Sequence, residues 1–221
     1  MLKKTAEISA VLSDLIKSVE FKIKHRNKET FFTRTVKLTF SIMMNLMIKK
    51  SSKSIQNSLN DMKLSGNVNY TVTNSAYTQA RAKLNYTAFE ELADKTVELF
   101  YTDGEYNRFK GFRLLAVDGS ITVLPNNDDI KKDFNPTLVT NNIDNFSKEI
   151  VQARVSVLYD VLNNIALHSI ITNTCKSKDN DLIVKDERTL AIEHLKYCTK
   201  DDLVNDILPD PRVRGISSLQ I

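Results

Sequence analysis

The sequence predicts an α+β protein in two parts, a helical domain over residues 1–103 and a mixed domain over residues 104–221. Apolar residues recur at helical spacing through the first hundred residues, as they do between Ile8 and Val19. After Asp103-Gly104 the pattern changes to short apolar and alternating runs, which are typical of strands. Charge divides the chain in a similar way. Met1–Asn85 holds 15 Lys or Arg against 5 Asp or Glu, a net charge of +10, whereas the whole chain has a net charge of only +4.

Five helices are expected in the first part. They cover the opening segment around Ile8–Val19, Thr33–Lys49, Ser51–Leu64, a segment from Asn74 or Ser75 to Leu84, and Thr87–Tyr101. Serine and asparagine at several of these starts are favoured helix caps. The methionines of the second helix are expected in the core, because flexible thioethers fill irregular apolar gaps.

The second part is expected to order its elements as strand, strand, strand, helix. The strands are 112–117 with its continuation to Pro125, Val151–Val161 and Ile165–Thr172, and the helix is Asp186–Tyr197. Asn163-Asn164 predicts a hairpin turn, and Asn126–Phe146 is expected to be a long loop.

An antiparallel meander followed by a helix is how an RNase H-like domain begins. Its next element would be a parallel strand, and Leu203-Val204 is the only candidate for the start of that strand.

Composition narrows the function classes. Cys175 and Cys198 form no CxxC pair, which argues against a zinc site or a disulfide framework. These unpaired cysteines and the lack of a signal-peptide pattern fit a cytoplasmic protein. The most apolar run, Leu38–Ile48, is shorter than the roughly 20 residues of a membrane span, so we expect no membrane partner. The basic first part fits nucleic-acid binding through phosphate contacts, and it also fits a solvated Lys-rich helical domain.

Asp118 is the main candidate for chemistry. It follows a strongly apolar run, where a carboxylate is costly to bury unless it is paired or binds a metal. The alternative is a turn, because Asp-Gly is a common hairpin signal between strands. On spacing alone we favour the turn.

Five segments are notable, in the order Phe32–Phe40, Ser54–Leu59, Val72–Leu84, Phe109–Ser120 and Ala153–Leu167. Together they resemble the IS4-like DDE transposases of bacterial insertion sequences, and the match covers about residues 30 to 200. Phe32–Phe40 is similar to the family's F-x-R-x-R-K-L-x-F, Val72–Leu84 to S-A-x-x-Q-A-R-x-K-L, and Phe109–Ser120 to G-x-R-L-x-A-x-D-G-S.

The resemblance implies a phosphoryl-transfer site of two aspartates and a glutamate on an RNase H-like fold. Asp118 matches the first catalytic aspartate and would be a ligand of two Mg²⁺ ions, which neutralise converging carboxylates. The partner would be double-stranded DNA at transposon ends, with phosphate contacts positioning the protein. In this setting Arg34, Lys37, Arg81 and Lys83 are the DNA-binding candidates, Arg34 and Lys37 sharing a helical face; ordinary surface charge is the alternative.

The chain departs from the family after its last helix. Pro209 and Pro211 cannot donate to a sheet ladder, so a central strand is not expected there, and neither Asp206 nor Asp210 has the right context for the second aspartate. The later glutamate helix is missing, so we expect a truncated, inactive transposase, broken near residue 204.

Two alternatives stay open. In the first, the chain is a non-catalytic fragment that binds DNA or forms a dimer, either with a second copy of itself or with a full-length relative that it inhibits. In the second, it is an unrelated α+β protein.

For the other notable polar residues, the sequence favours structural roles over catalytic ones. Asp160 ends a strand or caps a turn, with a place near the metal site as the alternative. Glu187 and Glu193 are expected to be solvated, and His168 to be a hydrogen-bonded residue at the edge of the core.

Overall fold

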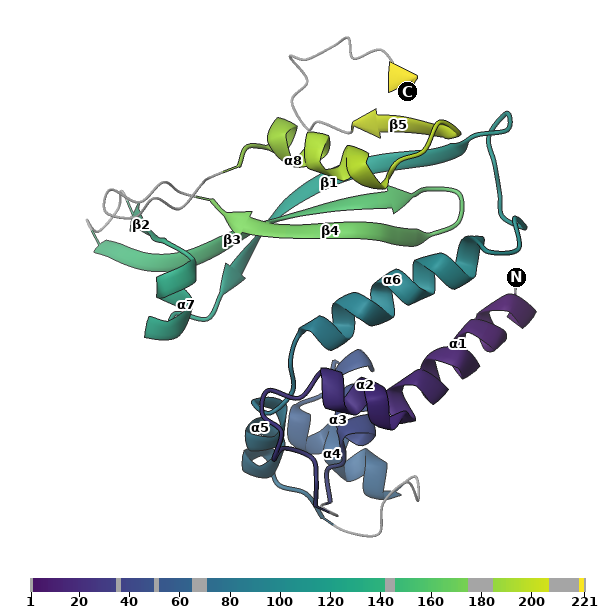
Figure 1. Cartoon of the computed structure of the whole chain (residues 1–221). Coiled ribbons are helices and arrows are strands. Elements are labelled where there is room, and N and C mark those ends of the chain that lie inside the picture. Colours follow the sequence, from purple (N-terminus) through teal and green to yellow (C-terminus); the bar gives the residue numbers. More distant parts are fainter. Residues whose placement is uncertain are drawn as a thin grey trace. The chain divides into compact units, whose positions relative to one another are not determined.

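The computed structural model describes residues 2–34, 37–49, 52–64, 71–141, 146–174, 185–206 and 219–220. The chain is an α+β protein with one mixed sheet, so the α+β class predicted from the sequence is confirmed (Figure 1). It divides into two compact units, unit 1 (residues 1–103) and unit 2 (residues 104–221).

Unit 1 is helical. Its described helices are α1 (Leu2–Lys17), α2 (Val19–Lys24), α3 (Phe40–Ile48), α4 (Ile55–Leu64), α5 (Asn74–Arg81) and α6 (Thr87–Tyr101). Hydroxyl side chains begin three of them, because Ser18, Thr39 and Thr73 each accept a hydrogen bond from a backbone N–H of the first turn. The cap of α5 is therefore Thr73, one residue before the earliest position that the sequence suggested.

The helix expected over Thr33–Lys49 is shorter than its apolar pattern suggests. It begins only after the cap Thr39, whose backbone is extended at φ −71° and ψ 165°. Phe32 has φ 56°, a left-handed conformation that a right-handed helix excludes. Arg34 and Lys37 lie in this non-helical part, so the prediction that they share a helical face is wrong.

The core of unit 1 draws apolar side chains from each of these helices. Met43 and Met44 are fully buried, which confirms the expected core role of the α3 methionines. Fully burying one such side chain contributes about 1.5–3 kcal/mol. Among the described residues no helix is both long and apolar enough to cross a membrane.

A buried histidine joins the end of α2 to the start of α6. His25 Nδ1 lies 2.8 Å from Thr87 Oγ1, and His25 Nε2 lies 2.8 Å from Glu91 Oε2. A hydrogen bond from Lys24 lowers the pKa of the Glu91 carboxyl, which keeps this acceptor ionised. The backbone bridge between Arg26 and Leu84 lies beside the histidine.

Unit 2 is built on the mixed sheet. Its elements are β1 (Arg113–Leu124), α7 (Asp128–Asp133), β2 (Pro136–Asn141), β3 (Phe146–Asp160), β4 (Ile165–Asn173), α8 (Glu187–His194), a 3₁₀ turn (Leu195–Tyr197), β5 (Asp202–Asp206) and β6 (Leu219–Gln220). The long strand β3 pairs antiparallel with β1, β2 and β4, and β5 pairs parallel with β1. The β3–β4 hairpin turns at Asn163-Asn164, as expected, with Asn164 left-handed at φ 56°.

The loop expected over Asn126–Phe146 contains regular structure. The side chain of Asn127 caps α7 by accepting a hydrogen bond from the Ile130 N–H at 2.9 Å. Pro136 then opens β2, a position where the missing N–H of proline is tolerated. The polar composition therefore conceals a short helix and a strand that pairs with the start of β3.

Helix α8 lies across one face of the sheet (Figure 1), against β1 and β3. Leu115 of β1, Leu158 of β3 and Leu190 of α8 are fully buried. Because strand side chains alternate between faces, this face is set by every second residue of β1 and β3.

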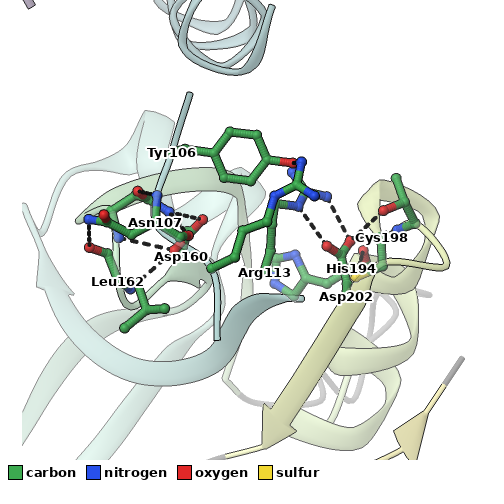
Figure 2. A network of polar contacts seen from close by, with 11 residues as sticks. Tyr106, Asn107, Arg113, Asp160, Leu162, His194, Cys198 and Asp202 are labelled. Carbon is green, nitrogen blue, oxygen red and sulfur yellow. Dashed lines mark hydrogen bonds and ion pairs between the residues drawn. The ribbon is translucent and has the colours of Figure 1, made fainter. Parts of the chain in front are cut away.

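A buried ion pair joins β5 to β1 (Figure 2). Asp202 receives hydrogen bonds from Arg113 Nε and Nη2, each at 2.6 Å, and from the Thr199 backbone N–H at 2.6 Å. The Asp202 side chain is fully buried and that of Arg113 is 10% exposed. Such a bidentate pair fixes geometry as well as contributing energy.

We expect Asp202→Asn to lower the free energy of unfolding of unit 2 by about 3–5 kcal/mol, because it removes the carboxylate charge that faces the buried Arg113 guanidinium. Hydrogen–deuterium exchange of the full chain, read on peptides from β1 and β5, measures the change. Asp129→Asn, which removes the exposed ion pair with Lys132, is the matched control and should leave exchange unchanged. Equal protection in the two variants would contradict the prediction.

Candidate functional site

Asp118 lies in the middle of β1 and is exposed. The strand continues through it without a turn, and each residue from Leu115 to Leu124 pairs in register with β3. The turn that spacing alone favoured is therefore wrong. A partner strand as long as β3 supplies the ladder that holds Asp-Gly extended.

The residues that flank Asp118 point toward α8. A Cβ at Gly119 would lie 3.6 Å from Glu187 Cγ of that helix, and Ser156, the β3 partner of Gly119, contacts α8 as well. Alternation along the strand then places the Asp118 side chain on the opposite face. There its direct cross-strand neighbour is Val157.

Glu187 and Glu193 are not simply solvated, contrary to the expectation from sequence. Glu187 forms an ion pair with Arg154 of β3, and Glu193 forms one with Lys185 at 2.6 Å. The hydrogen bond from Lys185 lowers the pKa of the Glu193 carboxyl. Both carboxylates thus have partners within unit 2.

The parallel strand after α8 exists, and the expectation that proline would prevent it is wrong. β5 covers Asp202–Asp206 and ends before Pro209, and Leu203-Val204 follows its first residue, close to the start that the sequence suggested. Its last residue, Asp206, is in register with Val117 and so lies one position from Asp118. Asp210 falls outside the described residues.

Asp160 serves the β3–β4 turn. It is fully buried, and its Oδ1 accepts hydrogen bonds from the backbone N–H groups of Leu162 and Asn163, both at 3.1 Å. Asn163 Nδ2 donates to the other oxygen at 2.8 Å and to the carbonyl of Asn107 at 3.0 Å (Figure 2). The turn-capping interpretation of Asp160 is therefore confirmed.

Two histidines, the buried His194 and the half-buried His168, lie together between α8 and the sheet. His194 Nδ1 lies 3.0 Å from His168 Nδ1, and its Nε2 lies 3.0 Å from Ser156 Oγ. Tyr197 stacks on His168 with ring centroids 3.8 Å apart. Because His168 also contacts His194, it is the hydrogen-bonded histidine that the sequence suggested. Burial, together with the neighbouring His168, lowers the pKa of His194 to about 4.

Three of the four basic candidates line one cavity of unit 1. Arg34, Lys37 and Lys83 border a hollow of about 770 Å³ that residues 30–34 and 37–38 line on one side and α5 on the other. Arg81, at the end of α5, is exposed and does not line it. Of the aromatic and threonine residues of the same cavity, Phe32, Thr33 and Thr73 fall within the segments Phe32–Phe40 and Val72–Leu84 noted in the sequence, whereas Thr30, Phe31 and Thr71 lie just outside them and were not singled out.

The described residues bring together fewer possible metal ligands than the resemblance implies. Among the described residues, no three His, Cys, Asp or Glu side chains gather closely enough to hold an ion.

Comparisons with protein-family models, curated proteins and solved structures found no match to this chain.

The low pKa of His194 predicts an acid-sensitive unit 2. In the unfolded chain this histidine takes up its proton near its ordinary pKa of 6.5, whereas in the folded chain it stays neutral until about pH 4. The folded state should therefore lose up to about 3 kcal/mol relative to the unfolded state as pH falls from 6.5 to 4.

Urea unfolding between pH 4 and 7.5 tests this on the full chain. His194→Gln, which keeps a polar partner for Ser156, should show a smaller loss of stability over that interval than the unchanged chain. Parallel pH profiles for the two proteins would refute the assignment.

Proposed function

We propose that the protein is an IS4-like DDE transposase chain that binds the duplex DNA of transposon ends through unit 1 and carries Asp118 of unit 2 as a metal-binding carboxylate. The observation that carries the proposal is the parallel pairing of β5 with β1, the strand that presents Asp118. An RNase H-like domain requires such a strand after three antiparallel strands and a helix. The order β1, β3, β4, α8, β5 therefore supports this fold for unit 2.

The chemistry implied for Asp118 is metal-assisted phosphoryl transfer. Magnesium is the expected ion because it prefers carboxylate and water oxygens. When bound, it would activate water for nicking or a DNA 3′-hydroxyl for strand transfer. The exposure of Asp118 in the middle of a strand that is paired along its length with β3 suits a ligand position.

We further propose that this chain alone binds DNA without efficient cutting. Two-metal transfer needs several carboxylates that converge on one point. The cross-strand partner of Asp118 is Val157, and Asp206 is in register with Val117 rather than with Asp118. The alternative, a non-catalytic fragment that inhibits a full-length relative by sharing its DNA or by dimerising with it, retains the same DNA-binding unit.

Charge supports DNA binding by unit 1. The first 85 residues hold a threefold excess of basic over acidic side chains, 15 against 5. Arg34, Lys37 and Lys83 gather around one hollow rather than being scattered over the surface. Cations that are arranged together can contact successive phosphates and release condensed counterions.

Binding of the full chain to duplex DNA should weaken steeply with salt. Each of Arg34→Ala, Lys37→Ala and Lys83→Ala should lower affinity and reduce the slope of log K against log salt by about 1, since one phosphate contact is lost. Fluorescence anisotropy over a salt series measures both quantities.

Lys95→Ala is the control, because Lys95 forms an ion pair with Glu98 on α6, away from the hollow. A flat salt response in the unchanged chain would count against phosphate contact. Equal effects of all four substitutions would count against the hollow as its location.

Nicking of supercoiled DNA with Mg²⁺ or Mn²⁺ tests the catalytic proposal. We expect little cleavage by this chain, and any that occurs should be lost in Asp118→Asn and kept in Asp128→Asn, which changes an exposed aspartate of α7. Robust cleavage that depends on Asp118 would overturn the view that the chain does not cut. Cleavage that survives Asp118→Asn would overturn the assignment of the metal ligand.

A further inference from the structure

We propose that the cavity of unit 1 holds a single unpaired nucleotide of a DNA strand, with its base inside and its phosphate on the basic rim. The proposal deepens the DNA binding proposed above and rests on it. A volume of about 770 Å³ lies within the range of ligand pockets, roughly 300–1,000 Å³. It is therefore larger than a simple phosphate contact requires.

The lining of the cavity combines two chemistries. Its apolar part is formed by Phe31, Phe32, Leu38, Val72, Ala76 and Ala80. Its charged part is formed by Arg34, Lys37 and Lys83, and none of the described lining residues is acidic. A ligand that matches both parts carries an apolar ring and an anionic group, and a nucleotide has both.

An aromatic ring with cations above it lies at this cavity. The ammonium groups of Lys28 and Lys83 are each 5.8 Å from the centroid of Phe31, a half-buried ring. Aromatic rings beside cations are how proteins hold single-stranded nucleic acid, because every base has a face that can stack. Phe31 is therefore the expected stacking partner.

The wall of the cavity is held in an unusual backbone conformation. Phe32 adopts φ 56°, which is rare for a bulky residue. Its ring packs edge-on against Phe40 with centroids 5.4 Å apart, so core packing maintains the conformation. The 30–34 segment is thus shaped in advance of any ligand.

A second basic hollow adjoins the first. It measures about 330 Å³, shares Phe32, Thr33 and Arg34 with the cavity, and is lined in addition by Lys17 and Lys22. Arg34 therefore faces both hollows. Phosphates that flank an inserted nucleotide could follow this second hollow, which favours a nucleotide within a strand over an isolated one.

The first arm of the test compares small probes on the full chain by isothermal titration calorimetry. The 5′-monophosphate dAMP should bind at least about tenfold more tightly than deoxyadenosine or inorganic phosphate, since base stacking and phosphate contact both contribute. Equal affinity for dAMP and inorganic phosphate would overturn the proposal.

The second arm fills the cavity. Ala76→Phe places a large side chain at an exposed position of α5 that lines the hollow, and it should reduce dAMP affinity by about tenfold or more, the loss expected when base stacking is blocked. Ala93→Phe makes the same change at an exposed position of α6 outside the hollow and should leave dAMP binding unchanged. Equal effects of the two variants would overturn the location.

The third arm distinguishes a nucleotide of DNA from a free nucleotide. A duplex with one unpaired 2-aminopurine should bind more tightly than the fully paired duplex, and Ala76→Phe should remove that preference while keeping the salt slope. Binding of dAMP without any preference for the unpaired duplex would overturn the assignment to DNA.

The two proposals also fail separately. If duplex binding depends steeply on salt but dAMP binds no more tightly than inorganic phosphate, only the nucleotide cavity is refuted. If dAMP binds more tightly than inorganic phosphate but duplex binding does not change with salt, duplex binding by unit 1 is refuted.

Discussion

The architecture of unit 2 depends on the buried ion pair between Arg113 and Asp202. Each residue begins its strand, and the two are in register, so the pair sets where β5 meets β1. Thr199 donates its backbone N–H to the same carboxylate, which ties the turn after α8 to this point as well. The position of every residue further along β5, including Asp206, follows from that register.

Much of this arrangement could be read from the sequence, because the relevant signals are local. The change from helical to strand-like apolar patterning at Asp103-Gly104 coincides with the division into two units. Thr87–Tyr101 is a helix over the residues that its periodicity indicates. Arg113 is the one polar residue in the apolar run of residues 112–117, which marks it in the sequence as a residue that needs a partner. Its partner could not be identified, since Asp202 is 89 residues away and lies among other aspartates.

Errors arose where tertiary pairing overrides a local signal. Asp118-Gly119 has the composition of a turn, yet a fifteen-residue β3 keeps it extended. The polar stretch from Asn126 hides α7 and β2 because a side-chain cap and an edge pairing leave little trace in hydropathy. The cavity of unit 1 could not be predicted for a related reason, since it forms only where residues 30–34 and 37–38 meet a helix some forty residues later in the chain.

The histidine that joins α2 to α6 constrains when unit 1 can form. His25 receives its partners from Thr87 and Glu91, and the adjoining backbone bridge comes from Leu84. During synthesis, the first two helices therefore wait for some sixty further residues before this polar group is satisfied. Until then the part of α1 that packs against α6 stays uncovered at the ribosome, where a chaperone that shields apolar segments would have its longest opportunity to act.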